Sequence, residues 1–182
     1  AELDRMTAAE VIAPGSPYYS IFTEYARLGL DPAMLAELPP DVAIRMESLI
    51  GEELGWGDVA GEDDATARHW LGAYAGNVGT VFHWHGETFS IPPGATRLFA
   101  NQYCTNQMFA LGPHLGMQCH VEMTPEMIST WCEQWAEEAA SVTGQPSVQT
   151  PGTMQAEIGE RLPVMRRLSE QLYSVWIKGL AR

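Results

Sequence analysis

Basic residues and cysteines are both scarce in this sequence. Its 182 residues include 10 Lys and Arg against 23 Asp and Glu, which gives a formal net charge of −13. A charge of this sign repels phosphate backbones, so we expect no nucleic-acid partner. The three cysteines show no C-x-x-C spacing, and their odd number disfavours a secreted disulfide framework. We therefore expect a reducing, cytoplasmic setting.

Long apolar runs and a signal-like leader are also lacking. No run approaches the roughly 18 apolar residues that a membrane-spanning helix needs, and the first residues, AELDRMTAAEV, do not show the basic-then-apolar pattern of a signal peptide. With 46% hydrophobic and 18% charged residues, the composition is that of a globular protein large enough to bury a core. We expect no membrane association.

A nucleophile elbow is missing as well. Cys or Ser nucleophiles commonly lie on a tight strand-to-helix turn between glycines, but neither G-x-C-x-G nor G-x-S-x-G occurs in this sequence. Cys104 has bulky neighbours and no nearby glycine. Cys119 adjoins His120 but points to the opposite face of an extended strand. Cys132 lies on a predicted helix beside an apolar stripe, where a structural thiol is usual.

Two different patterns divide the chain. Residues 1–52 carry short helix signals, such as the capping box formed by Thr7 and Glu10. From about residue 53, alternating and β-branched runs broken by Gly and Pro predict strands up to residue 121, and helical periodicity follows. We predict a helical N-terminal segment over 1–52, and over 53–182 an α/β domain with a mixed sheet and flanking helices.

Local signals place several elements within the second region. Residues 61–74 predict a short helix, and GPH at 112–114 predicts a hairpin connection. Thr124 is a good N-cap, and Pro125 suits the first position of the helix that follows. Pro163 lies inside the last helical stretch, which we expect it to kink or split.

The best candidate for chemistry is the pair His120 and Glu122. Residues two apart share a face of an extended chain, so the carboxylate can reach the imidazole. A carboxylate on one ring nitrogen fixes the tautomer and raises the basicity of the other nitrogen, as the base and orienter of a triad require. The alternative is a structural histidine at a strand end beside a solvated glutamate.

A second candidate is the pair His83 and His85 in FHWHG. Two histidines on one face of a strand can bind one metal ion, and the segment is similar to the cupin metal motif. However, Gly79 and Glu87 stand too close to the histidines, and no second histidine motif follows. We predict structural histidines beside a binding cleft, with no metal and no cofactor. The alternative is a metal ion held by His83, His85 and His120.

Four ordered motifs carry a family resemblance. They are GWGDV (55–59), FHWHGETFSIPPGATRLFAN (82–101), NQMFALG (106–112) and LGMQCHVEMTPEM (115–127). In this order they resemble the C-terminal half of the class I glutamine amidotransferases, in particular the bacterial branch related to the glutaminase domain of GMP synthase. The resemblance covers about residues 53–140 well.

The resemblance implies a Cys-His-Glu glutaminase. Such an enzyme hydrolyses the amide of glutamine, or of another γ-glutamyl small molecule, through a γ-glutamyl thioester and releases ammonia. At the matching positions, His120 would be the general base and acid, and Glu122 its orienter. His85 and Gly86, in the HGE turn, would lie near the substrate cleft.

This sequence departs from the family in one serious respect. The family's first half carries the nucleophile in a G-x-C-x-G-x-Q elbow, and residues 1–52 match none of it. Smaller departures are Cys119, where the family has an aromatic residue, and Val121, where it has a proline. The expectation is a protein that keeps the His-Glu part of the triad and is not active alone, unless another chain or a removed segment supplies the nucleophile.

The alternative is a non-enzymatic binding or assembly protein built on a remnant of the fold. Strands that lose their usual partners would leave open sheet edges. We expect the helical N-terminal segment, a second copy of the chain or a partner subunit to cover them.

Overall fold

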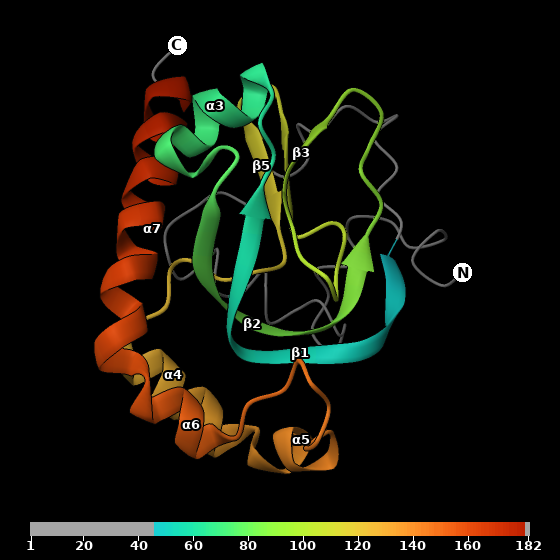
Figure 1. Cartoon of the computed structure of the whole chain (residues 1–182), viewed down its shortest axis with the longest axis vertical. Helices are drawn as coiled ribbons and strands as arrows, with labels where there is room; N and C mark the ends of the chain where they lie inside the picture. Colours follow the sequence, from blue (N-terminus) through green and yellow to red (C-terminus); the bar gives the residue numbers. More distant parts are fainter. Residues whose placement is uncertain (1–45, 181–182) are drawn as a thin grey trace. The chain divides into compact units, whose positions relative to one another are not determined.

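The computed structural model describes residues 46–180 (Figure 1). The helical segment predicted over 1–52 therefore lies almost wholly outside the described residues and stays a prediction. The first strand, β1 (Met46–Gly61), begins ahead of the domain boundary predicted at 52/53.

A five-stranded sheet forms the centre of the described unit. After β1 come β2 (Val78–Phe89), β3 (Thr96–Ala100), β4 (Met108–Leu111) and β5 (His114–Met117), and the strand order across the sheet is β2-β1-β3-β4-β5. The registers of β3 with β1, of β3 with β4 and of β4 with β5 are antiparallel. A single parallel bridge joins Leu54 to Val148.

The sheet curls back on itself near its two edge strands. An antiparallel bridge joins Phe82 in β2 to His120, three residues beyond the end of β5. Two backbone hydrogen bonds make this bridge, from the Phe82 N–H to the His120 carbonyl (3.0 Å) and from the His120 N–H to the Phe82 carbonyl (2.7 Å). The bridge fixes residue 120 beside β2.

Helices pack against the curled sheet. They are α3 (Ala65–Leu71), which continues as the 3-10 helix η3 (Gly72–Tyr74), then α4 (Pro125–Gln134), α5 (Ala136–Ser141), α6 (Pro151–Ala156) and α7 (Ile158–Leu180). The long α7 runs beside β2, with α3 near its C-terminal end and α6 near its start (Figure 1). Among residues 46–180, no helix combines the length and apolarity that crossing a bilayer requires.

The short-range predictions are confirmed, with one exception. The predicted helix over 61–74 corresponds to α3 and η3, the turn at 112–114 joins β4 to β5, and the Thr124 hydroxyl caps α4 by accepting from the Met127 N–H. The expectation that Pro163 splits the last helix is wrong, and a kink at this residue stays a prediction. The break between α6 and α7 comes at Glu157, and α7 continues through Pro163.

Two apolar clusters form the core. The first packs α3 and α7 on the sheet around residues such as Leu71, Phe99 and Leu168. The second packs α4, α6 and the start of α7 around Trp56 and Phe82. The α/β class predicted from the sequence is confirmed, because helices pack against a central sheet. The sheet is curled, and the strand pairs β1–β3, β3–β4 and β4–β5 are antiparallel.

Candidate active site

The pair His120 and Glu122 is formed in the structure. The Nδ1 atom of His120 lies 2.7 Å from Oε1 of Glu122. An ionised carboxylate can only accept, so Nδ1 carries the hydrogen and Nε2 keeps its lone pair. This is the tautomer that a general base needs, and it leaves Nε2 free to take a proton from a neighbouring group.

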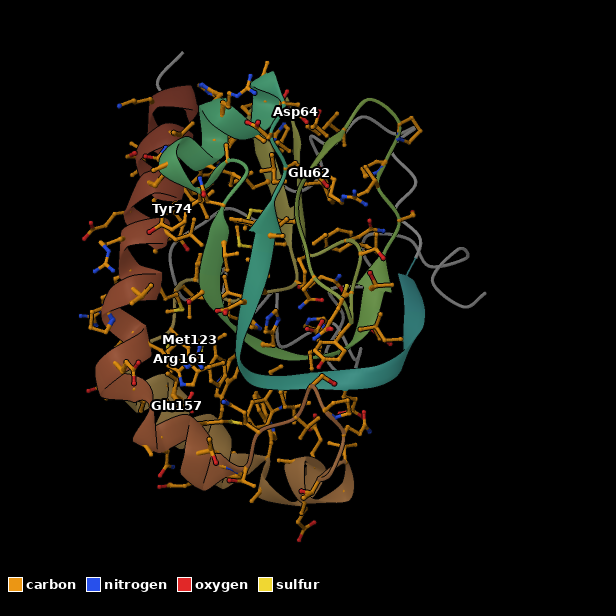
Figure 2. All side chains as sticks on the ribbon, in the orientation of Figure 1. Glu62, Asp64, Tyr74, Met123, Glu157 and Arg161 are labelled. Atoms are coloured by element: carbon orange, nitrogen blue, oxygen red, sulfur yellow. The ribbon has the colours of Figure 1, made fainter. Side chains whose placement is uncertain are left out.

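Alternating burial presents this pair on one face of the chain. Cys119, Val121 and Met123 are almost fully buried, whereas the side chains of His120 and Glu122 are 28% and 40% exposed. Met123, labelled in Figure 2, belongs to the second apolar cluster and Val121 to the first. The backbone on both sides of Glu122 is therefore anchored in the core, which limits the freedom of the His-Glu pair.

Further contacts hold the two side chains in place. The second carboxylate oxygen of Glu122, Oε2, accepts from the Val121 N–H at 2.9 Å. The His120 ring meets Trp131 of α4 edge to face, with 4.9 Å between ring centres. Both oxygens of Glu122 thus have defined donors, and an aromatic ring packs against the imidazole of His120.

The ionisation of Glu122 follows from these contacts. Burial opposes the charged form, but the hydrogen bond and the charge of His120, together with backbone hydrogen bonds, outweigh it. The pKa of Glu122 is consequently lowered. The carboxylate stays ionised at neutral pH and can stabilise an imidazolium at His120.

No cysteine is placed to act with His120. All three cysteines lie in the described residues and are buried and unpaired. The Cys119 thiol faces the Gln107 carbonyl at 3.8 Å, and Cys104 contacts Thr88 and Gln118 at 3.3 Å each. Cys132 contacts Met154 and the Pro151 carbonyl.

The chemistry of these thiols agrees with their positions. Burial raises the pKa of Cys104, of Cys119 and of Cys132 above the ordinary value for a thiol. A thiol whose pKa is raised holds little of the nucleophilic thiolate at neutral pH. The sequence prediction that Cys119 points away from His120 is confirmed.

His83 and His85 point to one side of β2, as the alternation predicts. Their ring centres are 5.6 Å apart, and Phe82 and Trp84 stack on each other on the other side. The two histidines meet Glu53 of β1, with 3.4 Å between His85 Nε2 and Glu53 Oε2. Gly86 follows directly, and a Cβ at this position would lie 3.0 Å from Glu52 Cγ.

Sequence reasoning missed Glu53. It lies 30 residues before His83 in a strand whose pairing no local pattern reveals, and its carboxylate is buried. The one available signal was an acidic residue, in GEELGWG, within a run that otherwise predicts a buried strand.

Comparisons with known proteins show what the chain is similar to. No family model matches the chain. A curated relative, the glutamine amidotransferase-like protein YfeJ of Salmonella typhimurium, is 31% identical over 94 residues, which is 51% of this chain and 39% of that protein. The chain thus matches about two fifths of the length of this relative.

Solved structures of glutamine amidotransferases have a similar fold. A crystal structure of a glutamine amido transferase from Methylobacillus flagellatus superposes with a TM-score of 0.73 and 27% identity, covering 96% of this chain and 73% of that one. A glutamine amidotransferase from Thermotoga maritima has the same fold, with a TM-score of 0.66 and 23% identity over 95% of this chain and 74% of that one. The chain therefore has the class I glutamine amidotransferase fold and is similar in sequence to a glutamine amidotransferase-like protein.

Proposed function

We propose that this chain provides the general base and its orienter, His120 and Glu122, for hydrolysis of the glutamine amide, and that its 182 residues do not hydrolyse glutamine alone. The observation that carries the proposal is the 2.7 Å hydrogen bond between the two side chains. The names of the similar proteins support glutamine as the substrate.

The chemistry would proceed in two stages. The free Nε2 of His120 takes the proton from a cysteine thiol, and the thiolate attacks the amide carbonyl of glutamine. Nε2–H then protonates the leaving nitrogen, which departs as ammonia and leaves a γ-glutamyl thioester. In the second stage Nε2 takes a proton from water, the hydroxide attacks the thioester, and glutamate and the thiol are released. Glu122 stabilises the imidazolium in both stages.

The thiol in this scheme must come from outside the sequence given. The three cysteines of the chain are buried and their pKa values are raised. A second copy of the chain would bring the same three buried thiols, so it could cover a sheet edge but not complete the triad. We therefore propose that the nucleophile lies on a different chain or on a segment joined to this one. Three unpaired cysteines also support a reducing, cytoplasmic setting.

His85 and Gly86 are proposed to border the glutamine cleft. They follow Phe82 on β2, and the backbone of Phe82 is bonded to that of His120. The HGE residues 85–87 lie within β2 rather than in a turn, and this bridge brings the strand beside the proposed catalytic pair. Gly86 leaves the backbone accessible because it has no side chain, so its N–H and carbonyl suit a small polar substrate.

A fusion protein tests this proposal. A G-x-C-x-G segment from a complete glutamine amidotransferase would be joined ahead of residue 46, and the release of glutamate and ammonia would be measured. We expect turnover in the fusion and its loss in His120→Ala. The matched control is His69→Ala, an exposed histidine on α3, which should leave turnover unchanged. Turnover that is equal in the fusion and in its His120→Ala variant would contradict the role of His120.

A further inference from the structure

Glu53, His83 and His85 form a buried group, of which the proposed function uses only His85, at the border of the glutamine cleft. One ligand atom from each residue lies within 4.8 Å of the others. Glu53 and His83 are each 2% exposed, and the side chain of His85 is 10% exposed. Two strands that are neighbours in the sheet, β1 and β2, supply the three residues. The group is therefore fixed by the sheet rather than by loops.

Three of the four imidazole nitrogens of this group lack a hydrogen bond among the described residues. Within residues 46–180, neither ring nitrogen of His83 has a partner, although both are buried. Buried polar atoms are normally paired with protein or with a bound species, because leaving one unpaired costs roughly 1–3 kcal/mol. Two such atoms on one fully buried ring indicate that something other than the described side chains binds there.

The tautomer of His85 sharpens this argument. Its Nδ1 lies 3.0 Å from the carbonyl oxygen of Glu87, which can only accept, so Nδ1 carries the hydrogen. The lone pair of Nε2 consequently faces the Glu53 Oε2 atom at 3.4 Å. Two acceptors that face each other repel unless a cation lies between them. An N–H donated to a backbone carbonyl is also the usual support of a metal-binding histidine.

Hydrogen bonds hold the Glu53 carboxyl group in place. Asn101 Nδ2 donates to Oε1 at 2.5 Å, and Gln107 Nε2 donates to Oε2 at 2.6 Å. Each oxygen keeps a lone pair for a second partner.

From this geometry we propose that Glu53, His83 and His85 bind one transition-metal ion, of which Zn²⁺ fits best. Two imidazole nitrogens and one carboxylate oxygen are a donor set of three-ligand zinc sites. Bonds of about 2.0–2.2 Å in a tetrahedron put ligand atoms about 3.3 Å apart. His85 Nε2 lies 3.4 Å from Glu53 Oε2, and His83 Nε2 lies 4.0 Å from the other oxygen, Oε1. The three ligand atoms lie within 4.8 Å of one another, so the side chains must move inward to complete the site.

The His83 ring packs closely against the backbone of β1. A Cβ at Gly57 would lie 2.7 Å from His83 Cδ2 and Nε2, so only a glycine at this position accommodates the ring. Gln107 Oε1 is buried without a partner among the described residues. A water molecule on the metal could donate to this oxygen, so we expect three protein ligands and one water.

The metal site uses other residues than the His-Glu pair, although, after burial, the charge of His120 also contributes to lowering the pKa of His83 and of His85. Metal binding is measured on the chain alone, without glutamine or a nucleophile. Failure of the fusion protein to release ammonia would therefore not count against the metal site, and failure to bind metal would not count against the role of His120.

A cobalt titration tests the proposal. The untagged chain would be freed of metal with EDTA, dialysed, and titrated with Co²⁺ and then with Zn²⁺. We expect one Co²⁺ per chain with the intense visible absorption of a four- or five-coordinate ion, and its displacement by one Zn²⁺. Weak absorption typical of six-coordinate Co²⁺, or no saturable binding, would overturn the proposal. This result needs only the wild-type chain.

Substitutions identify the ligands. Affinity for Zn²⁺ should fall at least about 100-fold in His83→Gln and in Glu53→Gln, since each removes a direct ligand, a greater loss than the 10- to 100-fold typical of supporting residues. The matched control is His69→Gln, which should bind as the wild type does. Circular dichroism would show that each variant is folded. Unchanged affinity in a folded His83→Gln or Glu53→Gln variant would refute the assignment.

Discussion

At the scale of single residues, the alternation along 119–123 decides what the candidate site can do. Odd-numbered side chains enter the core and even-numbered ones face outward. The same backbone geometry that brings Glu122 to His120 therefore sends the Cys119 thiol to the Gln107 carbonyl. A cysteine adjacent in sequence to the base is excluded as its partner by the period of two of an extended chain.

Glu122→Gln should weaken the pair in a pH-dependent way. An amide has one acceptor oxygen, so it cannot accept from both His120 and the Val121 N–H. We expect a loss of about 1 kcal/mol in the free energy of unfolding at pH 7, a low value for a charged acceptor because the group is partly exposed.

The sign of the pH dependence follows from the lowered pKa of Glu122. The folded pKa lies below the ordinary value of 4.5, so the stabilisation is complete above pH 4.5 and is lost as the pH falls through the folded value. Urea unfolding of wild type and Glu122→Gln at several pH values checks this. The difference in free energy of unfolding between the two proteins should shrink as the pH falls, and a difference that grows would contradict this prediction.

Two glycines give opposite predictions for the same substitution. A Cβ at Gly116 in β5 would collide with the Phe109 ring, so Gly116→Ala should destabilise the chain by about 1–3 kcal/mol. Gly159 is exposed in the first turn of α7, and a Cβ there meets nothing within 4 Å. Gly159→Ala should stabilise by about 0.5–1 kcal/mol. Thermal unfolding of both variants checks the two predictions. Equal changes in melting temperature would contradict the packing described for β4 and β5.

At the scale of elements, features set by neighbouring residues were predictable and long-range pairings were not. Thr124 and Pro125 mark the start of α4, and Gly112 and Pro113 mark a hairpin, because caps and turns depend on residues a few positions apart. His120 and Glu122 were found for the same reason. By contrast, the Gln149 side chain accepts from the backbone N–H of Trp56 across 93 residues, a contact that no local pattern predicts.

The continuity of α7 through Pro163 is another feature that local sequence patterns did not predict. Proline removes one hydrogen bond, but α7 keeps its packing on both sides of the residue, since Leu162 and Met165 are buried in the second apolar cluster. Tertiary packing here outweighs the local penalty of proline.

Glu53 was missed because its contact with His83 depends on the pairing of β1 and β2.

The cap of α4 should influence the catalytic pair, because Trp131 on this helix contacts the His120 ring. Thr124→Ala removes the hydroxyl that accepts from the Met127 N–H and should cost about 1 kcal/mol of stability. The matched control is Thr150→Ala, which removes the equivalent cap of α6. Both should lower stability alike in urea unfolding, but only Thr124→Ala should reduce turnover of the fusion protein. An equal loss of turnover in both would contradict a specific role for α4.

At the scale of the whole molecule, the chain has the fold of a glutamine amidotransferase, and its match covers 39% of the curated relative YfeJ. No G-x-C-x-G elbow occurs in its 182 residues. A base and orienter without a nucleophile lose the covalent path, since members of a triad act as a unit. This is why we propose that activity depends on a thiol supplied from elsewhere.

The most direct test is the release of ammonia from glutamine by the pure 182-residue chain, measured beside its His120→Ala variant. We predict that the two proteins release ammonia at the same background rate, because His120 has no thiol to activate. Release by the wild-type chain that His120→Ala abolishes would contradict the account, since it would show a nucleophile within these 182 residues.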